Sequence, residues 1–208
     1  MTQILENQVV LITGAAGALG SRIAKLFAAE GAAVALLDRA DSNLGALSLE
    51  IEALGARVSV HPTDITDSQQ VARAVMGAVG AHGKISSLIN VVEVSGHVNE
   101  MTEADFDALM AVNLKGVWLA VRHAVPHLRD AENASIINLS NGDFPSNTSV
   151  LAKELRSDGI RVNGIALAQV DAGVQADQVA LAALYLCSSQ AALVTGSVLM
   201  LDAGLRSR

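Results

Sequence analysis

The stretch Val9-Val10-Leu11-Ile12-Thr13-Gly14-Ala15-Ala16-Gly17-Ala18-Leu19-Gly20 decides the fold of this chain. It runs from an apolar segment into a glycine-rich turn, and a helix-favouring segment up to Glu30 follows at once. The order strand, glycine-rich turn, helix start is how a doubly wound α/β fold holds the pyrophosphate of a dinucleotide. Gly14 would allow the tight turn, Gly17 the approach of backbone to a phosphate, and Gly20 close packing of helix on strand. The candidate residues of this contact are Gly14, Gly17, Leu19 and Gly20.

Length and composition set the frame for this motif. The 208 residues fit a single domain over residues 1–208, and 51% of them are apolar but only 2% aromatic. A core of small aliphatic residues suits helices packed on a parallel sheet. The net charge of −7 argues against a nucleic-acid partner or an anionic membrane surface. The single cysteine, Cys187, excludes an internal disulfide and is interpreted as an inert, buried thiol.

Apolar runs alternate with helical patterns along the whole chain, without a linker or a repeat. Strands are predicted at Val9–Thr13, Ala33–Leu37, Arg57–His61, Leu88–Val92, Ser135–Leu139, Arg161–Ala166 and Ser197–Leu201. Helices are predicted at Ala18–Glu30, Asn43–Leu54, Ser68–Ala81, Glu103–Arg129, Val150–Ser157 and Asp177–Ser188, with Thr102 and Asp105 capping the fourth. The expected fold is a single Rossmann-like, doubly wound parallel sheet of about seven strands with helices on both faces. No segment resembles a signal peptide or a membrane span, so a soluble, cytoplasmic protein is expected.

An acidic residue follows the glycine turn at the spacing that a dinucleotide site requires. Asp38 closes the second strand, where a carboxylate can accept hydrogen bonds from the ribose 2′-OH and repel a 2′-phosphate. This favours NAD over NADP. Arg39 follows directly and could pair with a 2′-phosphate, while the simpler interpretation of both residues is a polar strand end.

Further motifs together resemble the short-chain dehydrogenase/reductase family over almost the entire chain. Besides the glycine turn, the matching segments are Asp64-Ile65, Leu88-Ile89-Asn90, Val112-Asn113-Leu114-Lys115-Gly116, Ser135-Ile136-Ile137-Asn138-Leu139-Ser140, Gly159-Ile160-Arg161-Val162-Asn163-Gly164-Ile165 and Val194-Thr195-Gly196-Ser197-Val198-Leu199. The resemblance implies that Asp64, with Ile65, contacts the adenine and that Asn90 shapes the cofactor cleft. It also implies that Asn113 positions a proton-relay water.

The chain departs from this family where the chemistry should lie. Members use a Ser, a Tyr and a Lys, the last two spaced Tyr-x-x-x-Lys, with Tyr as the general acid/base. Here the only tyrosine is Tyr185, at a position interpreted as core, and the segment between Ser140 and Gly159 is too short for the family's catalytic loop and helix start. Lys153 is interpreted as a surface lysine. Ser140 matches the first of a Ser-Ser pair, but Asn141 stands where the catalytic serine is usual.

Other segments that would surround the cofactor and the substrate also depart from the family pattern. The expected Asn-Asn-Ala-Gly reads Asn90-Val91-Val92-Glu93, the expected Pro-Gly reads Leu167-Ala168, and Ala172 stands where a threonine often holds the carboxamide. The substrate-covering loop is reduced to Val170–Ala176. His97, Asp143 and Glu93 are weak candidates for a substitute acid/base. The remaining histidines, at 61, 82, 123 and 127, show no metal-ligand spacing, so no metal site is expected.

Three functions remain open on this pattern. The first is an NAD(H)-binding homologue with lost or strongly impaired oxidoreductase activity, in which Asn113 and Ser140 are only remnants of the catalytic set. The second is an active NAD-dependent oxidoreductase that converts an alcohol or ketone through non-standard acid/base residues. The third is a structural, oligomer-forming protein with an empty cleft. The resemblance also implies a dimer or tetramer, formed here through the fourth helix or the carboxyl-terminal strand. Relaxed constraint or truncation of the chain would each explain the missing segment.

Overall fold

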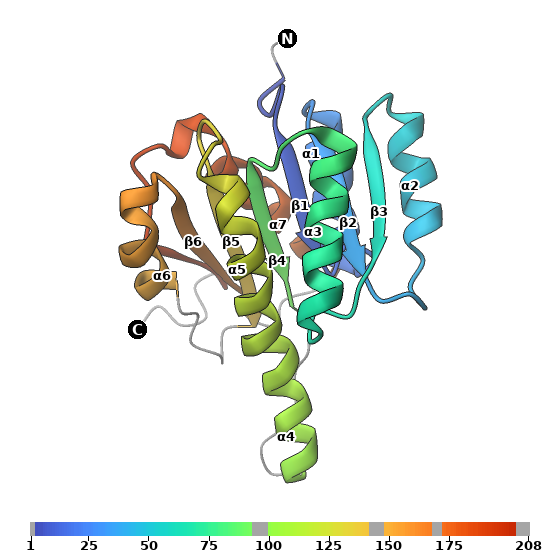
Figure 1. Cartoon of the computed structure of the whole chain (residues 1–208), viewed down its shortest axis with the longest axis vertical. Coiled ribbons are helices and arrows are strands. Elements are labelled where there is room, and N and C mark those ends of the chain that lie inside the picture. Colours follow the sequence, from blue (N-terminus) through green and yellow to red (C-terminus); the bar gives the residue numbers. More distant parts are fainter. Residues whose placement is uncertain (1–2, 93–99, 142–147, 168–171, 203–208) are drawn as a thin grey trace.

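The computed structural model describes residues 3–92, 100–141, 148–167 and 172–202. Seven parallel strands form one sheet in the order β3-β2-β1-β4-β5-β6-β7 (Figure 1). The strands are β1 (Val9–Thr13), β2 (Ala33–Asp38), β3 (Val58–Pro62), β4 (Ser87–Val91), β5 (Ser135–Asn141), β6 (Arg161–Leu167) and β7 (Val198–Leu201). The strand order reverses between β1 and β4, which is where ligands bind in a doubly wound sheet. The predicted fold class is therefore confirmed.

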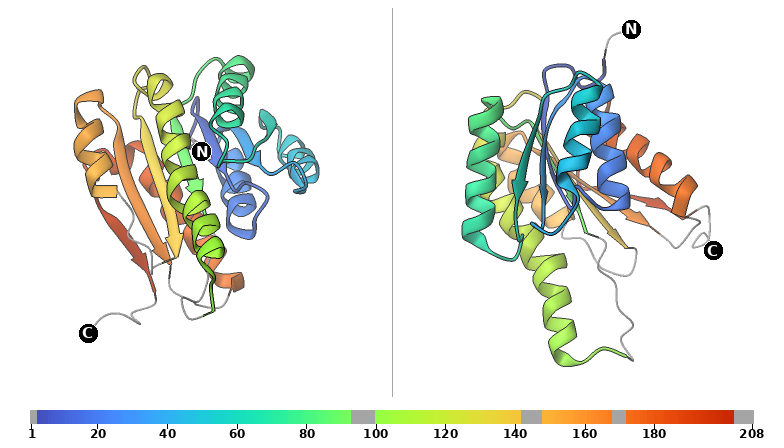
Figure 2. Two further views of the ribbon diagram at one scale, coloured as in Figure 1. Left: turned by 60° about the horizontal axis from the view of Figure 1, so that its bottom comes forward. Right: turned by 90° about the vertical axis from the view of Figure 1, so that its right-hand side faces the viewer.

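Helices cover both faces of this sheet (Figure 2). The helices are α1 (Ala18–Ala29), α2 (Leu44–Ala53), α3 (Ser68–His82), α4 (Glu103–Met110), α5 (Val117–Leu128), α6 (Thr148–Glu154) and α7 (Ala172–Cys187), with a π-helical segment η1 (Ala111–Gly116) and 3₁₀ turns η2 (Leu155–Asp158) and η3 (Ser189–Ala191). Residues of α1, α2 and α7 form one core layer, and residues of α3, α5 and α6 form the other. Strand β1 is buried throughout and feeds Val10 and Ile12 into the first layer and Leu11 into the second.

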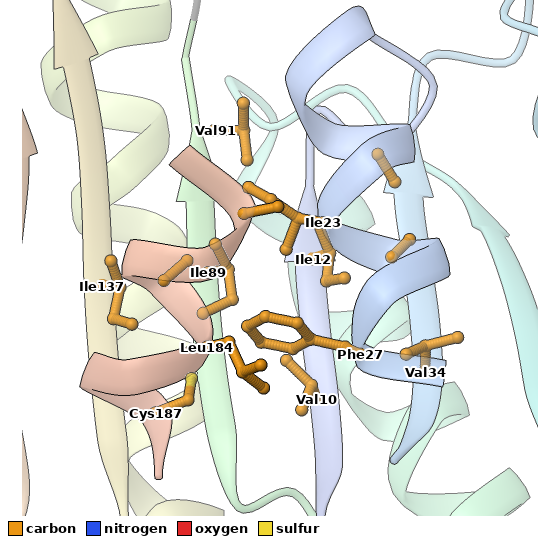
Figure 3. Close-up of a cluster of buried hydrophobic side chains, with 14 of the residues drawn as sticks. Val10, Ile12, Ile23, Phe27, Val34, Ile89, Val91, Ile137, Leu184 and Cys187 are labelled. Atoms are coloured by element: carbon orange, nitrogen blue, oxygen red, sulfur yellow. The ribbon is translucent and has the colours of Figure 1, made fainter. Parts of the chain in front are cut away.

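The first core layer is built around Phe27 of α1, which is fully buried (Figure 3). Figure 3 shows its ring between α1 and α7, facing Val10 of β1 and Leu184 of α7. Cys187 lies in the same layer and is 1% exposed, which confirms a buried thiol. Burial raises the pKa of this thiol, and hydrogen bonding with Ser135 only partly offsets that effect, so the reactive thiolate is disfavoured.

Four predictions about the helices need correction. The predicted helix Glu103–Arg129 is interrupted by the π-helical segment, although its predicted capping box, Thr102 with Asp105, is confirmed. The predicted helix at Val150–Ser157 ends its α-helical part at Glu154 and continues as a 3₁₀ turn. The last predicted helix begins five residues before Asp177, at Ala172, and so includes Gly173 in its first turn.

Tyr185 is the fourth correction, because it is 44% exposed rather than part of the core. It lies one helical turn after Leu181, which is 50% exposed, so the two form the outer stripe of α7. The inner stripe is made by smaller neighbours such as Ala183 and Cys187. A composition of small aliphatic residues thus fills the core without its one tyrosine.

The carboxyl end of α7 is held by a buried arginine that sequence reasoning did not assign a role. The guanidinium of Arg161, on β6, donates to the carbonyl of Leu186 at 2.7 Å and to Asn133 Oδ1 at 3.2 Å. Asn133 in turn donates to the carbonyl of Cys187 at 3.0 Å. A cation at this end of a helix satisfies its last carbonyls and complements its dipole. In the part of the chain that is described, no helix is long and apolar enough to cross a membrane.

Candidate functional site

Two glycines of the turn between β1 and α1, Gly14 and Gly20, have no space for a side chain. Gly14 has a φ of +62°, and a Cβ there would lie 2.3 Å from the carbonyl oxygen of Val91. A Cβ on Gly20 would lie 2.0 Å from the carbonyl oxygen of Gly14. The sequence predicts that Gly20 allows close packing of the helix on the strand, but in the structure Gly20 packs on the turn itself. The positive φ of Gly14 agrees with the tight turn that the sequence predicts at this residue.

Helix α1 begins directly behind this turn. Gly17 occupies its N-cap position and has no side chain to cap it, and the first turn, which includes Leu19 and Gly20, carries no acidic residue. Backbone N–H groups and the positive end of the helix dipole thus face the carboxyl edge of the sheet. Such a helix start is a binding site for an anion such as a pyrophosphate.

Asp38 lies at the carboxyl end of β2, beside the turn. Its Oδ2 accepts a hydrogen bond from the backbone N–H of Ala16 at 2.8 Å, and its Oδ1 accepts one from the N–H of Arg39 at 2.8 Å. These two bonds fix the half-buried carboxylate against the glycine turn. Each carboxylate oxygen can accept a further bond, so Asp38 remains able to take the hydroxyl hydrogens of a ribose.

Arg39 is turned toward another acid. Its guanidinium forms a two-bond pair with the carboxylate of Asp41, at 3.1 Å from Nε and 2.7 Å from Nη2. Hydrogen bonding and the charge of Asp41 raise the pKa of Arg39. The cation that could have received a 2′-phosphate is thus already paired, although at the surface.

The loop after β3 brings Asp64 and Ile65 to the same edge. Asp64 is exposed and accepts hydrogen bonds from the backbone N–H and the hydroxyl of Thr66, at 2.9 Å and 2.7 Å. Ile65 packs on Gly116 in the π-helical segment, where a Cβ would lie 2.8 Å from its side chain. Gly116 therefore allows the helix that carries Asn113 to approach this loop closely.

A line of buried polar side chains crosses the centre of the sheet beneath the site. Thr13 Oγ1 donates to Asn90 Oδ1 at 3.3 Å, and Asn90 Nδ2 donates to Asn138 Oδ1 at 2.9 Å. The side chain of Asn90 is 0% exposed, and its hydrogen bonds link β1, β4 and β5 below the carboxyl edge of the sheet. Its neighbours Val91 and Val92 are also buried, and Figure 3 shows Val91 close to Ile23 of α1, within the core.

The two remaining candidates lie beyond this line. Asn113 is half-buried within the π-helical segment, a feature that often marks functional sites. Ser140 is half-buried near the carboxyl end of β5, where its register partner is Ala166 of β6. Glu93, His97, Asp143 and Ala168 lie outside the described residues, as do the side chains of Asn141 and Ala172.

Comparisons with known proteins agree with this geometry. A family profile described as short chain dehydrogenase matches residues 8–143, which is more than half of the chain. The 3-oxoacyl-[acyl-carrier-protein] reductase FabG of Thermotoga maritima is 31% identical over an alignment of 242 positions, which covers 97% of this chain and 98% of that protein. The chain belongs to the short-chain dehydrogenase family. Momilactone A synthase of Oryza sativa subsp. japonica is 34% identical over 252 positions, covering 97% of this chain and 90% of that relative.

Solved structures of short-chain dehydrogenases share the same fold. A dehydrogenase/reductase from Sinorhizobium meliloti 1021 superposes with a TM-score of 0.89 at 28% identity, covering 99% of this chain and 97% of that one. A short-chain dehydrogenase/reductase from Burkholderia xenovorans gives a TM-score of 0.89 at 25% identity and covers 99% of both chains. Members of this family bind a dinucleotide, NAD or NADP, together with a substrate.

The only tyrosine in the sequence of this family member, Tyr185, lies near the amino ends of the strands, whereas the glycine turn lies at their carboxyl ends. Tyr185 lies two residues before Cys187, whose sulfur accepts a hydrogen bond from Ser135 at the start of β5. Ser140 lies five residues further along the same strand, which corresponds to about 17 Å. Lys153 is exposed on α6, which confirms the prediction of a surface lysine. Tyr185 therefore lies at the end of the sheet opposite to the edge where the glycine turn and Asp38 lie.

Proposed function

We propose that this short-chain dehydrogenase homologue binds NAD(H) and has lost most or all of its oxidoreductase activity. One contrast carries the proposal. The glycine turn and Asp38 retain an arrangement that fits a dinucleotide, while the only tyrosine of the chain lies at the opposite end of the sheet. The protein would act in the cytoplasm by association or as a sensor of the dinucleotide, and has no nucleic-acid or membrane partner.

Each residue of the proposed cofactor site has one task. Gly14, Gly17, Leu19 and Gly20 would hold the pyrophosphate at the start of α1, Asp38 the adenosine ribose, and Asp64 with Ile65 the adenine. NAD, when bound, supplies a group that accepts or donates a hydride. The carboxylate of Asp38 and the pairing of Arg39 with Asp41 both favour NAD over NADP, because a 2′-phosphate would meet a negative charge.

The impaired activity is supported by what surrounds Ser140. The family profile ends at residue 143, and the alignment with the Thermotoga maritima reductase is 242 positions long although this chain has 208 residues. The difference supports a chain that is shorter than its relatives within the aligned region. Helix α6, which follows, has only seven residues before its 3₁₀ turn. A segment carrying the family's Tyr-x-x-x-Lys would have to lie in this part of the chain.

Binding and turnover together test this function. We expect NAD and NADH to bind with micromolar dissociation constants in calorimetry, and NADPH to bind more weakly. Turnover of a panel of small alcohols and ketones should be about 10²–10⁴-fold slower than that of the Thermotoga maritima reductase on its own substrate, because a positioned general acid is missing. Turnover at the relative's rate would instead establish an active oxidoreductase. Absence of binding at millimolar NAD would leave the structural alternative.

Self-association of the chain is a second part of the proposal, and α4 with α5 supports it. Helix α4 extends beyond the sheet and buries only Leu109 (Figure 1). Phe106, Leu114 and Trp118 are 51%, 43% and 49% exposed along this helical region. A stripe of this kind is suited to an isologous contact with a second copy. The exposed Val198, Leu199 and Met200 of edge strand β7 offer another such contact.

Trp118→Glu should therefore shift a dimer or tetramer toward monomer by at least about tenfold in dissociation constant, because a charge would be placed in the apolar contact. Light scattering across protein concentration measures this shift. Leu49→Glu on α2 is the matched control, since Leu49 is 68% exposed but lies on another face of the molecule. A monomeric wild-type protein at high concentration would rule out the contact.

A further inference from the structure

We propose that Ser59, His61 and His82 form a proton-sensitive latch that holds edge strand β3 against α3 and thereby the loop of Asp64. The latch would regulate the cofactor site and to that extent rests on the proposed function. Ser59 Oγ lies 2.8 Å from Nε2 of His61, two residues along β3. The same oxygen lies 2.9 Å from Nε2 of His82, in the last turn of α3. One hydroxyl thus joins two imidazoles from two elements.

The position of β3 makes this contact important for the strand. β3 is the last strand at its side of the sheet and pairs only with β2, so α3 is its main support on the face of the two histidines. The His61 ring packs directly on Gly77 of α3, where a Cβ would lie 2.9 Å from ring atoms. Gly77 therefore creates the space into which the ring fits. The histidine–serine–histidine chain is the polar part of this packing.

The hydrogen bonds from Ser59 to both rings can form together as long as at least one ring is neutral. With at least one neutral ring, the hydroxyl of Ser59 donates to a ring nitrogen and accepts an N–H from the other. When both rings are protonated, both Nε2 atoms carry hydrogen, and the hydroxyl can no longer donate to either. The Nδ1 atom of His82 is buried and has no hydrogen-bond partner among the described residues. A protonated His82 would thus bury an N–H without an acceptor, which costs free energy.

Burial and the charges around the two rings favour their neutral forms. Burial, the guanidinium of Arg57 and His61 all lower the pKa of His82, and burial lowers the pKa of His61. Arg73 of α3 lines the same surface pocket as His61. The acid at the start of α3, Asp67, is bound to its own helix through the backbone N–H groups of Gln69 and Gln70.

Among the described residues, the other neighbours of the two rings bring no compensating anion. On β2 the residues paired with Ser59 and His61 are Ala35 and Leu37, and α2 packs with the core layer on the other face. Histidines whose pKa is lower in the folded chain contribute full stability above their unfolded pKa of about 6.5. That stability is lost as the pH falls below 6.5 through the lowered values. The latch is therefore closed at neutral pH and opens in acid.

Short hydrogen bonds connect the latch to the cofactor site. Thr63 Oγ1 donates to the carbonyl of His61 at 2.8 Å, and the Thr63 N–H donates to the carbonyl of Asp38 at 2.6 Å. The N–H of Asp64 donates to Oε1 of Gln70 on α3 at 3.0 Å. The loop that would contact the adenine is thus held by hydrogen bonds both to the sheet and to α3. Separation of these two elements would displace both Asp38 and Asp64.

Stability and exchange measurements without cofactor test the latch directly. We expect the unfolded-to-folded ratio of the wild-type chain, extrapolated from urea unfolding, to rise about tenfold or more between pH 7.5 and 5.5. Amide exchange in residues 57–66 should accelerate over the same range. His61→Gln/His82→Gln should reduce both effects at least threefold. His123→Gln is the matched control, since His123 lies 3.0 Å from a single serine, Ser68, at the surface, and it should leave both effects unchanged.

The variant Gly77→Ala tests the packing of the His61 ring on α3 without removing either histidine. The added methyl group would push the His61 ring from its place while both histidines remain, so exchange in residues 57–66 should already be fast at pH 7.5. The NAD dissociation constant of the wild type should rise about threefold or more at pH 5.5, and that of the double variant should not. Unchanged pH dependence in the double variant, or normal protection in Gly77→Ala, would overturn the latch. Failure of NAD to bind at any pH would overturn the proposed function, while the unfolding and exchange results would still decide the latch.

Discussion

Replacing Gly20 with alanine will lower the free energy of unfolding by about 3 kcal/mol and weaken NAD binding at least about 100-fold. The new Cβ would lie 2.0 Å from the carbonyl oxygen of Gly14 and 2.9 Å from Cα of Ala15. Both atoms belong to the backbone and cannot rotate away as the end of a side chain can. Helix α1 or the turn must therefore shift, and the N–H groups that would hold the pyrophosphate shift with it.

Gly80→Ala provides the control for this substitution. Gly80 also lies in a helix, α3, but a Cβ there has no atom within 4 Å. This variant should be about 0.5–1 kcal/mol more stable than the wild type, since alanine is the better helix former. Urea unfolding and calorimetry with NAD measure both variants. Normal NAD binding by Gly20→Ala would show that the turn is not the pyrophosphate site.

The sheet could be predicted because its signals are local. All seven predicted strands are present, and β1 coincides with Val9–Thr13 in both bounds. Most strands are short apolar runs, and β3 alternates apolar and polar residues, so a window of about ten residues contains the information. The same holds for the capping box of Thr102 and Asp105, which lie three residues apart.

Features that depend on contacts between distant segments could not be predicted. The π-helical segment around Asn113 is accompanied by the packing of Gly116 on Ile65, 51 positions earlier in the chain. The exposed place of Tyr185 follows from which stripe of α7 faces the sheet, and the alanine-rich pattern of that helix leaves the stripe ambiguous. The histidine–serine–histidine latch joins β3 to the end of α3, 23 residues apart, with no motif in the sequence.

The candidate site was predictable in part for the same reason. Gly14, Gly20 and Asp38 follow a spacing that sequence alone reveals, and the structure brings Asp38 to the glycine turn. The buried pairing of Asn90 with Asn138 is not visible in the sequence, because each residue taken alone is only a single polar position within an apolar strand. The pairing of Arg39 with Asp41 is not predicted by the sequence either, although the two are only two residues apart.

Replacing Asp38 with alanine will weaken NAD binding about 100-fold and leave NADPH binding much less affected. The variant loses the acceptor that a ribose 2′-OH would use, and a hydrogen bond to a charged group contributes about 1.5–3 kcal/mol. It also loses the bonds that the carboxylate accepts from the N–H groups of Ala16 and Arg39, both at 2.8 Å. Because the Ala16 N–H belongs to the glycine turn, the turn itself should become more mobile.

Asp41→Ala is the matched control, because it removes an acid three positions further along without touching the turn. Arg39 would then be released from its two bonds to Asp41 and become available to a 2′-phosphate. NAD binding should stay within about twofold of the wild type, and NADPH binding should strengthen about tenfold. Calorimetry with both dinucleotides on both variants separates the two acids. Wild-type affinity for NAD in Asp38→Ala would mean that the carboxylate only braces the glycine turn, and the preference for NAD would then have to come from another part of the site.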